Sequence, residues 1–346
     1  MDKLFDIINI PFSYILRFIA DMSGGNFAVA VFVFTLLINL AFIPLTIKSQ
    51  KSAVQQMRIK PKLDALREKC GDDKQKYSME MQELYQKEGV SMGGGCLPML
   101  LRLVVMMSIY WLIMSPVTYL SGVEKAKVNN VNTVITESFN ELKKSDKDKY
   151  DDITKKLDWS AKNVNNQLGI IKIVRDNEKL DILKDSLTDK QYGKIEDDLQ
   201  YMIKKDKEAG IEFSLFGIDL TATPKFSIDI FNAFNRTWIM PLLAFVAQML
   251  TSVMSSIMQK KQNPDAPSMM GMLLMMPLMS LFIGFGFPCG VTFYWACSSL
   301  IGGVIQILVQ QFYGPHKLLS KERAKQLAKQ CDFESAQISK LGAVEK

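Results

Sequence analysis

The sequence predicts an all-α polytopic membrane protein in which five transmembrane helices surround a hydrophilic groove. Two observations favour this class. Five predominantly apolar stretches are each long enough to cross a bilayer, which needs about 20 residues. The segments between them are dense in Lys, Asp and Glu, although the 346-residue chain is 48% hydrophobic with a net charge of only +6. Such a division is typical of a chain that crosses a membrane several times.

The five spans are bounded by charged or turn-forming residues. The last two spans are separated only by the uncharged turn 286–290, so we expect them to form a hairpin. The predicted ranges are 24–47, 96–120 and 237–259 for the first three spans and 268–313 for the hairpin of the fourth and fifth.

The N-terminal segment 1–23 is a shorter apolar stretch that Pro11 interrupts and that carries Arg17 and Asp21. Its larger apolar residues recur at helical spacing, namely Phe12, Ile15, Leu16 and Ile19. We predict an amphipathic helix that lies in the membrane interface. A short additional span is the alternative.

Positive residues in short loops set the orientation, because such loops remain in the cytoplasm. The loop 48–95 carries ten Lys or Arg, Lys260 and Lys261 follow the third span, and the tail 314–346 is rich in Lys. These segments, with the C-terminus, are therefore predicted to be cytoplasmic. The polar segment 121–236 then lies outside, since loops beyond about 60 residues escape the rule.

Both large loops are predicted to be helical. In the loop 48–95, apolar residues recur at helical spacing on either side of Gly71-Asp72-Asp73, which predicts a helical hairpin. The segment 121–236 has candidate helices near 134–144 and 179–207 and no alternating β pattern. We interpret it as a helical insert, with a partly disordered insert as the alternative.

Arg102 is the principal candidate functional residue. Across the five spans it is the only Asp, Glu, Lys or Arg well inside an apolar stretch. An arginine there costs about 2.5–3.5 kcal/mol on insertion scales, so it normally faces water or a partner. We expect it to line a wet, positively charged groove. The alternative is that its side chain reaches the cytoplasmic headgroups.

Uncharged polar residues on three spans could line the same groove. The alternative for each is an ordinary hydrogen bond between helices, worth about 0.6 kcal/mol. The candidates are Thr35 and Asn39 on the first span, Gln248, Ser252 and Ser255 on the third, and Ser299, Gln306 and Gln310 on the fifth.

Several other functions are disfavoured. The chain has no motif of a serine hydrolase, zinc protease or nucleotide-binding loop, so no enzymatic activity is expected. Five cysteines form no CxxC pair and there is one histidine, so we expect neither a metal site nor a cofactor. No compact segment is strongly basic, which argues against nucleic-acid recognition.

Four sequence motifs resemble the YidC/Oxa family of membrane protein insertases, of the five-span type found in Gram-positive bacteria. They are "GGNFAVAVFVFTLLINLAFIPLTIKSQKS" from Gly24, the segment ending "CLPML" before Arg102, "LFGIDLTATP" from Leu215 and "FPCGVTFYWACSSL" from Phe287. Together they cover the chain except for roughly 121–212. We therefore expect that segment to lie outside the family core and to be dispensable for simple substrates.

The resemblance implies a function and a location. Members of this family insert hydrophobic segments of nascent proteins without ATP, through a groove open to the cytoplasm and to lipid. Their partners are nascent membrane proteins, the bilayer, the Sec translocon and the ribosome. It also implies a multi-pass protein of the bacterial plasma membrane.

This sequence departs from the family pattern at the groove. The family arginine, which attracts acidic residues of the substrate, is replaced here by Asn39. Conversely, Arg102 stands where relatives carry an uncharged polar residue, so the charge has moved to a neighbouring helix. A channel or transporter using the same cavity is an alternative, as is a membrane scaffold whose outer domain binds partners.

Overall fold

The computed structural model describes residues 2–71, 73–90, 97–159, 166–224, 235–262 and 270–314, with residues 317, 320, 324 and 327–335 of the tail. Over these residues the chain is helical apart from one two-stranded sheet, which confirms the predicted all-α class. The chain divides into two compact units. The first comprises 1–37, 104–249 and 274–299, and the second comprises 38–103, 250–273 and 300–346.

Two helices of the described chain are long and apolar enough to cross a membrane, judged by length and composition alone. They are Arg236–Met258, which contains most of α14, and Cys289–Tyr313, which is α16. The other apolar helices are shorter or bent, so five spans remain a prediction. The bounds are α2 Phe27–Ala41, α3 Ile43–Cys70, α5 Leu97–Met114, α14 Ile239–Gln262 and α15 Met270–Gly284.

Prolines explain two of the interruptions. The helices α2 and α3 would count as one span, but they are bent by 46° at Phe42, two residues before Pro44 in the first turn of α3. The helix α5 ends at Met114, six residues before the end of the predicted span, and the short α6 begins at Pro116. Proline lacks an N–H group and restricts the preceding residue, so helices end before it.

The N-terminal helix α1 (Asp2–Met22) is continuous through Pro11, so the expected interruption there is wrong. Pro11 removes one helical hydrogen bond, but the bonds on either side persist. The helix buries Leu16 and Ala20 and leaves other large residues exposed. The exposed large apolar residues are Ile7, Ile10, Tyr14, Ile15, Phe18 and Met22.

A polar contact ties the start of α1 to the insert, which from here on means residues 121–210. Lys125 Nζ donates to both carboxylate oxygens of Asp6 at 2.6 Å, and the Tyr119 hydroxyl donates to Asp6 Oδ1 at 2.6 Å. Burial would raise the pKa of Asp6, but the hydrogen bonds from Lys125 and Tyr119 hold it below its ordinary value. Asp6 is therefore a carboxylate that is stabilised in its charged form.

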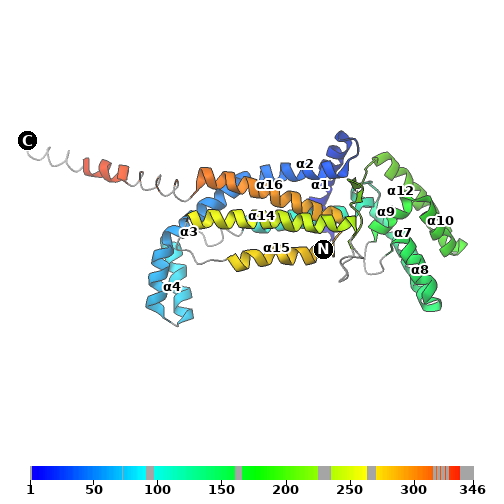
Figure 1. The fold of residues 1–346 in the computed structure, drawn as a ribbon, viewed down its shortest axis with the longest axis horizontal. Coiled ribbons are helices and arrows are strands. Elements are labelled where there is room, and N and C mark those ends of the chain that lie inside the picture. Colours follow the sequence, from blue (N-terminus) through cyan, green and yellow to red (C-terminus); the bar gives the residue numbers. More distant parts are fainter. Residues whose placement is uncertain are drawn as a thin grey trace, which may run out of the picture. The chain divides into compact units, whose positions relative to one another are not determined.

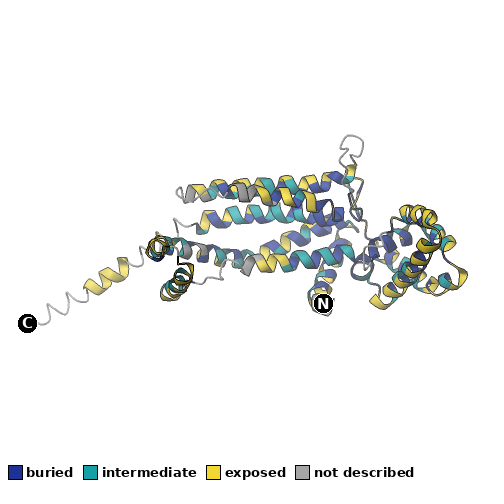
Figure 2. Cartoon of the chain, turned by 90° about the horizontal axis from the view of Figure 1, so that it is seen from below, coloured by how far each residue is buried: buried dark blue, intermediate teal, exposed yellow. Residues whose placement is uncertain are grey.

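The insert is helical over its described residues, as predicted. Its inner faces are buried and its outer faces exposed (Figure 2). Val131, Ile135 and Phe139 of α7 lie in its core, and the Phe139 ring packs edge-to-face against Trp159. The helices are α7 Lys125–Ser145, α8 Lys147–Leu157, α9 Gln167–Arg175, α10 Asn177–Ser186, α11 Asp189–Gly193 and α12 Glu196–Ala209.

The single helix predicted near 179–207 is wrong, because the structure has three helices there. Leu187 is extended at the end of α10, and Thr188 begins α11 with a capping box. In that arrangement the Thr188 hydroxyl accepts from the Gln191 backbone and the Gln191 side chain accepts from the Thr188 backbone. A capping box is a strong start signal, so it divides an otherwise helical stretch.

The helices α3 and α4 (Lys74–Lys87) pack side by side in the second unit (Figure 1). Asp73 caps α4 by accepting hydrogen bonds from the backbone of Gln75 and Lys76. Ion pairs join the two helices at both ends. Lys69 meets Glu80 near the turn, and Arg58 and Lys62 meet Glu88 at the far end.

The connecting segment (residues 211–222) links the insert to the beginnings of apolar helices. It contains the sheet β1 (Ser214–Leu215) and β2 (Ile218–Asp219). At the start of α2, the backbone N–H of Glu212 donates to the Gly25 carbonyl, and the Glu212 carbonyl accepts from the Phe27 N–H. At the start of α16, the N–H groups of Cys289 and Gly290 donate at 2.8 Å to the carbonyls of Ala222 and Leu220.

A close approach of two glycines fixes this arrangement. A Cβ atom on Gly25 would lie 2.1 Å from the carbonyl oxygen of Gly210, far inside contact distance. Both glycines have positive φ, which other residues rarely adopt. The end of α12 therefore reaches the α1–α2 junction only because Gly25 carries no side chain.

Candidate functional site

Two of the nine predicted site residues converge on one glycine of α16 in the second unit. A Cβ atom placed on Gly302 would lie 3.3 Å from Asn39 Oδ1 and 3.8 Å from Arg102 Nη1. Asn39 is on α2 and is 7% exposed, whereas Arg102 is on α5 and is exposed. Three helices thus meet at a point where a guanidinium and an amide lie against bare backbone.

The immediate surroundings of Arg102 are apolar. Its neighbours Leu100, Leu101 and Leu103 on α5 are exposed large hydrophobic residues, as is Leu40 next to Asn39. A charged group among exposed leucines is expensive in lipid unless water or an anion is near it. The Arg102 side chain instead lies toward α16, at Gly302, and remains accessible.

The helix α14 packs closely against α16 at Gly303, the residue after Gly302. A Cβ atom on Gly303 would lie 2.4 Å from Cγ2 of Thr251. Small residues at such positions allow the backbones of membrane helices to approach closely. Ser252, which follows Thr251, and Gln306 on α16 are both half-buried in this unit.

Ser255 on α14 is half-buried in the second unit, whereas Thr35, Gln248 and Ser299 belong to the first unit. The Thr35 hydroxyl donates to the Val31 carbonyl of its own helix at 2.6 Å, which is a bond within one helix rather than between helices. Gln248 on α14 and Ser299 on α16 are half-buried. Their proposed place in a groove with Arg102 remains a prediction.

Sequence reasoning missed two buried polar residues, Ser52 and Ser256, and identified a third, Gln310, as part of the polar stripe on the fifth span. Within the described part of the chain, Oγ of Ser52, Oγ of Ser256 and Oε1 of Gln310 are buried without a hydrogen-bond partner. All three belong to the second unit. Ser256 lies four residues after Ser252, so helical spacing could have found it. Buried polar atoms of this kind are usually satisfied by water.

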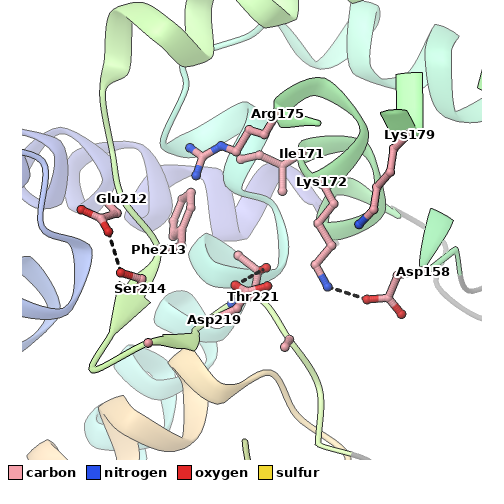
Figure 3. Close-up of a pocket in the computed structure, with 12 residues that line it drawn as sticks. Asp158, Ile171, Lys172, Arg175, Lys179, Glu212, Phe213, Ser214, Asp219 and Thr221 are labelled. Carbon is pink, nitrogen blue, oxygen red and sulfur yellow. Dashed lines mark hydrogen bonds and ion pairs between the residues drawn. The ribbon is translucent and has the colours of Figure 1, made fainter. Parts of the chain in front are cut away.

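A separate cavity of about 580 Å³ lies in the first unit, between α9 and the connecting segment. Arg175 reaches over the ring of Phe213, with the guanidinium carbon 4.6 Å from the ring centre (Figure 3). Lys172 pairs with Asp158 at 2.5 Å, and Asp219 accepts from Thr221. Positive and negative groups balance, so the lining selects neither anions nor cations.

Arg175 links the insert to this segment through a largely buried ion pair. Its guanidinium donates to both carboxylate oxygens of Asp206, at 2.7 and 2.8 Å, and to the carbonyl of Ile211. The Ser121 hydroxyl also donates to Asp206. One carboxylate thus connects α9, α12 and the start of the insert.

The fold and the polar convergence define an all-α membrane protein with a cationic group among its apolar helices. The 60Kd inner membrane protein family model matches residues 18–174 and 198–316. The match covers most of the chain, and the chain therefore belongs to this family, the YidC/Oxa family of the sequence motifs. It also includes residues 121–174, which corrects the expectation that the whole of 121–212 lies outside the family core.

Curated relatives carry the name membrane protein insertase YidC. The chain is 43% identical to the protein of Aliivibrio salmonicida over 108 residues, 31% of this chain and 20% of that protein. It is 42% identical to that of Stutzerimonas stutzeri over 93 residues, 27% of this chain and 17% of that protein. It is 46% identical to that of Vibrio cholerae over 94 residues, which are 27% of this chain and 17% of that protein. The chain thus spans about a fifth of the length of these relatives.

Proposed function

We propose that this protein inserts hydrophobic segments of nascent proteins into the membrane, through a positively charged groove and without ATP hydrolysis. The proposal rests on the family and on the convergence of Asn39 and Arg102 at Gly302, which is the observation that carries it. The resemblance to the family implies that relatives carry this arginine at the position of Asn39. Here the two positions face the same glycine, so moving the charge from α2 to α5 keeps it at the same place.

Buried polar atoms support a hydrated interior. An unsatisfied buried donor or acceptor costs about 1–3 kcal/mol. Ser52, Ser256 and Gln310 each bury one such atom without a partner in the part of the second unit that is described. Water in a groove beside these residues would remove the penalty. It would also hydrate the Arg102 guanidinium.

The proposed mechanism is physical rather than catalytic. Acidic side chains of a substrate approach Arg102, and water with the guanidinium replaces part of the hydration that they lose. The adjoining apolar segment then moves sideways into lipid, which is favourable by about 25 cal/mol for each Å² of apolar surface removed from water.

The proposed topology has five spans, with the α3–α4 hairpin and the C-terminal tail in the cytoplasm and the insert outside. The hairpin would make the first contact with incoming chains, the ribosome or the Sec translocon. Many exposed basic and acidic groups on α3 and α4 suit reversible contacts of this kind.

The test compares two model substrates that differ only in whether their translocated tail is acidic or uncharged. Arg102→Gln is expected to reduce insertion of the acidic-tailed substrate about ten-fold, equivalent to about 1.4 kcal/mol, and to spare the uncharged one. Arg102→Lys should retain activity because the role requires charge, and Arg102→Glu should be the most impaired. Protease protection measures insertion, with variant levels in the membrane matched.

A double variant tests the relocation itself. Asn39→Arg combined with Arg102→Gln should restore insertion of the acidic-tailed substrate, because both positions face Gly302. Unimpaired insertion by Arg102→Gln alone would end the charged-groove proposal. Impairment without rescue by the double variant would show that the guanidinium must come from α5.

A further inference from the structure

Phe216 is a fully exposed aromatic residue in a backbone conformation that bulky residues avoid. It lies in the turn between β1 and β2, where its side chain is 91% exposed. Its φ is +50°, and only one other described non-glycine residue, Asp158, has a positive φ. A bulky residue with positive φ is an outlier that usually reflects a functional constraint.

The register of the sheet shows how unusual this choice is. Ser214 pairs with Asp219 and Leu215 with Ile218, so Phe216 and Gly217 form a two-residue turn. Both have positive φ, as a type I′ turn requires. Asn-Gly is the favoured sequence for such a turn, because Asn tolerates the left-handed conformation. Folding alone therefore does not explain a phenylalanine at this position.

A second phenylalanine three residues earlier provides the contrast. Phe213 is 7% exposed, and its ring packs edge-to-face on Phe27 at 4.8 Å between centres. It also lies beneath the guanidinium of Arg175 (Figure 3). Phe213 thus holds the connecting segment to the rest of the unit, whereas the Phe216 ring projects away from it.

The turn lies at the level where apolar helices begin. The connecting segment bonds to the backbone beside Phe27, at the start of α2, and to Cys289 and Gly290, at the start of α16. A Cβ atom on Gly217 would lie 3.5 Å from Nη1 of Arg236. Arg236 is the first residue of the candidate span Arg236–Met258. If these helices cross the bilayer, the turn lies beside the membrane surface at which they begin.

We propose that Phe216 inserts into the boundary between headgroups and acyl chains, in the leaflet on the side of the insert. Aromatic residues are favoured at this depth, and Arg236 beside the turn is suited to lipid phosphates. The partner is lipid rather than protein, because the turn adjoins the end of a membrane-crossing helix. The proposal requires that α14 and α16 cross the membrane, but it does not depend on insertase activity.

Insertion of Phe216 would fix the depth of the connecting segment in the membrane. Backbone hydrogen bonds transmit that depth to the starts of α2 and α16, since Glu212, Leu220 and Ala222 belong to the same short segment. A rigid two-residue turn is well suited to this role, because it leaves the aromatic ring little freedom to withdraw.

The test uses the full-length protein in proteoliposomes and places a fluorescent reporter at the turn without removing its aromatic character. Phe216→Trp is compared with Asp185→Trp, an exposed position on α10 of the insert. Emission is measured relative to the wild-type protein, which has four tryptophans. Lipids brominated near the glycerol backbone report membrane contact, and acrylamide reports water access.

We expect brominated lipid to quench most of the emission added by Phe216→Trp, and acrylamide to have little effect on it. The emission added by Asp185→Trp should show the opposite pattern. Equal acrylamide quenching at both positions would overturn the proposal, because the turn would then be in water. Protection from both quenchers would also overturn it, since a protein contact would then cover Phe216. Unchanged circular dichroism establishes that each variant is folded.

Discussion

The insert and the α3–α4 hairpin are both highly charged helical regions, but they are stabilised differently. The insert has a core that includes Val131, Ile135 and Phe139, and an ion pair in which the Asp206 side chain is only 10% exposed. The helix α4 has no buried residue among those described. Its ion pairs with α3 involve side chains that are 22–68% exposed.

The difference indicates which region is a folded domain and which is an adjustable surface. Apolar burial and buried charge pairs depend little on salt, whereas exposed pairs contribute little and are screened. The insert should therefore keep its structure independently of bound partners. The hairpin can change its ion pairs at small cost, which suits a surface that meets many different chains.

The largest contrast should come from the core. Phe139→Ala removes a ring that packs on Tyr150 and Trp159. It should destabilise the insert by about 3–5 kcal/mol. The matched change on α4, Met79→Ala, should have less than about 0.5 kcal/mol of effect, because Met79 is 64% exposed. Hydrogen exchange of α7 and α4 amides in the full-length protein measures both. Similar losses would remove the distinction between the regions.

The buried ion pair should rank next. Asp206→Ala leaves the Arg175 guanidinium without its carboxylate and should cost about 3 kcal/mol. The control is Asp152→Ala, which breaks a pair with Lys156 in which both side chains are more than half exposed. That change should alter exchange rates in α8 less than about five-fold. A weak effect of Asp206→Ala would mean that solvent reaches the pair.

The contact between α1 and the insert should have an intermediate effect. Asp6→Asn weakens the bonds from Lys125 and Tyr119 and should raise exchange in the first turns of α1 about ten-fold, as expected for charge-assisted hydrogen bonds. Because these bonds lower the folded-state pKa of Asp6, their contribution is complete above its ordinary value of 3.8 and disappears as pH falls through the folded value.

Hydrogen exchange of the α1 amides is measured from pH 8 to pH 3 and corrected for the intrinsic exchange rate at each pH. This measurement checks the contact. Protection of α1 in the wild-type protein should be constant down to about pH 5 and decline only below about pH 4. The Asn variant should show no such decline. A transition near neutral pH would point to a titrating group other than Asp6.

The smallest effect should come from the hairpin. Glu88→Gln removes the partner of Arg58 and Lys62, whose hydrogen bonds lower the pKa of Glu88. It should change exchange of α4 amides less than about five-fold. In 1 M salt, where the Debye length is about 3 Å, variant and wild type should become equal. A difference that persists in salt would show that packing, rather than charge, holds α4.

Local patterns predicted the class of fold and the most unusual residue, but not the contacts between distant segments. Arg102 is recognisable because a lone charge in an apolar stretch is rare. The role of Gly302 could not be predicted, because it depends on three helices meeting. The break before Pro44 and the capping box at Thr188 were both visible in the sequence, yet apolar length and helical spacing outweighed them in our interpretation.

The expected dispensability of the insert shows the same limit. A polar segment between spans resembles a tolerant loop. In the structure, however, Lys125 holds Asp6 of α1, and Arg175 bonds both Asp206 and the Ile211 carbonyl. These partners are far apart in sequence. Deletion of 125–210 would remove Lys125, Arg175 and Asp206 together, and should therefore disturb α1 and the connecting segment.

The glycine pair at the end of the insert has a consequence for protein engineering. A Cβ atom on Gly25 would lie 2.1 Å from the Gly210 carbonyl oxygen, Gly210 has a positive φ of 56°, and at the other boundary a Cβ atom on Gly122 would lie 2.9 Å from the Arg17 guanidinium. Both ends of the insert are thus fitted to α1. A chimera that exchanges this module must therefore keep its junctions at these glycines.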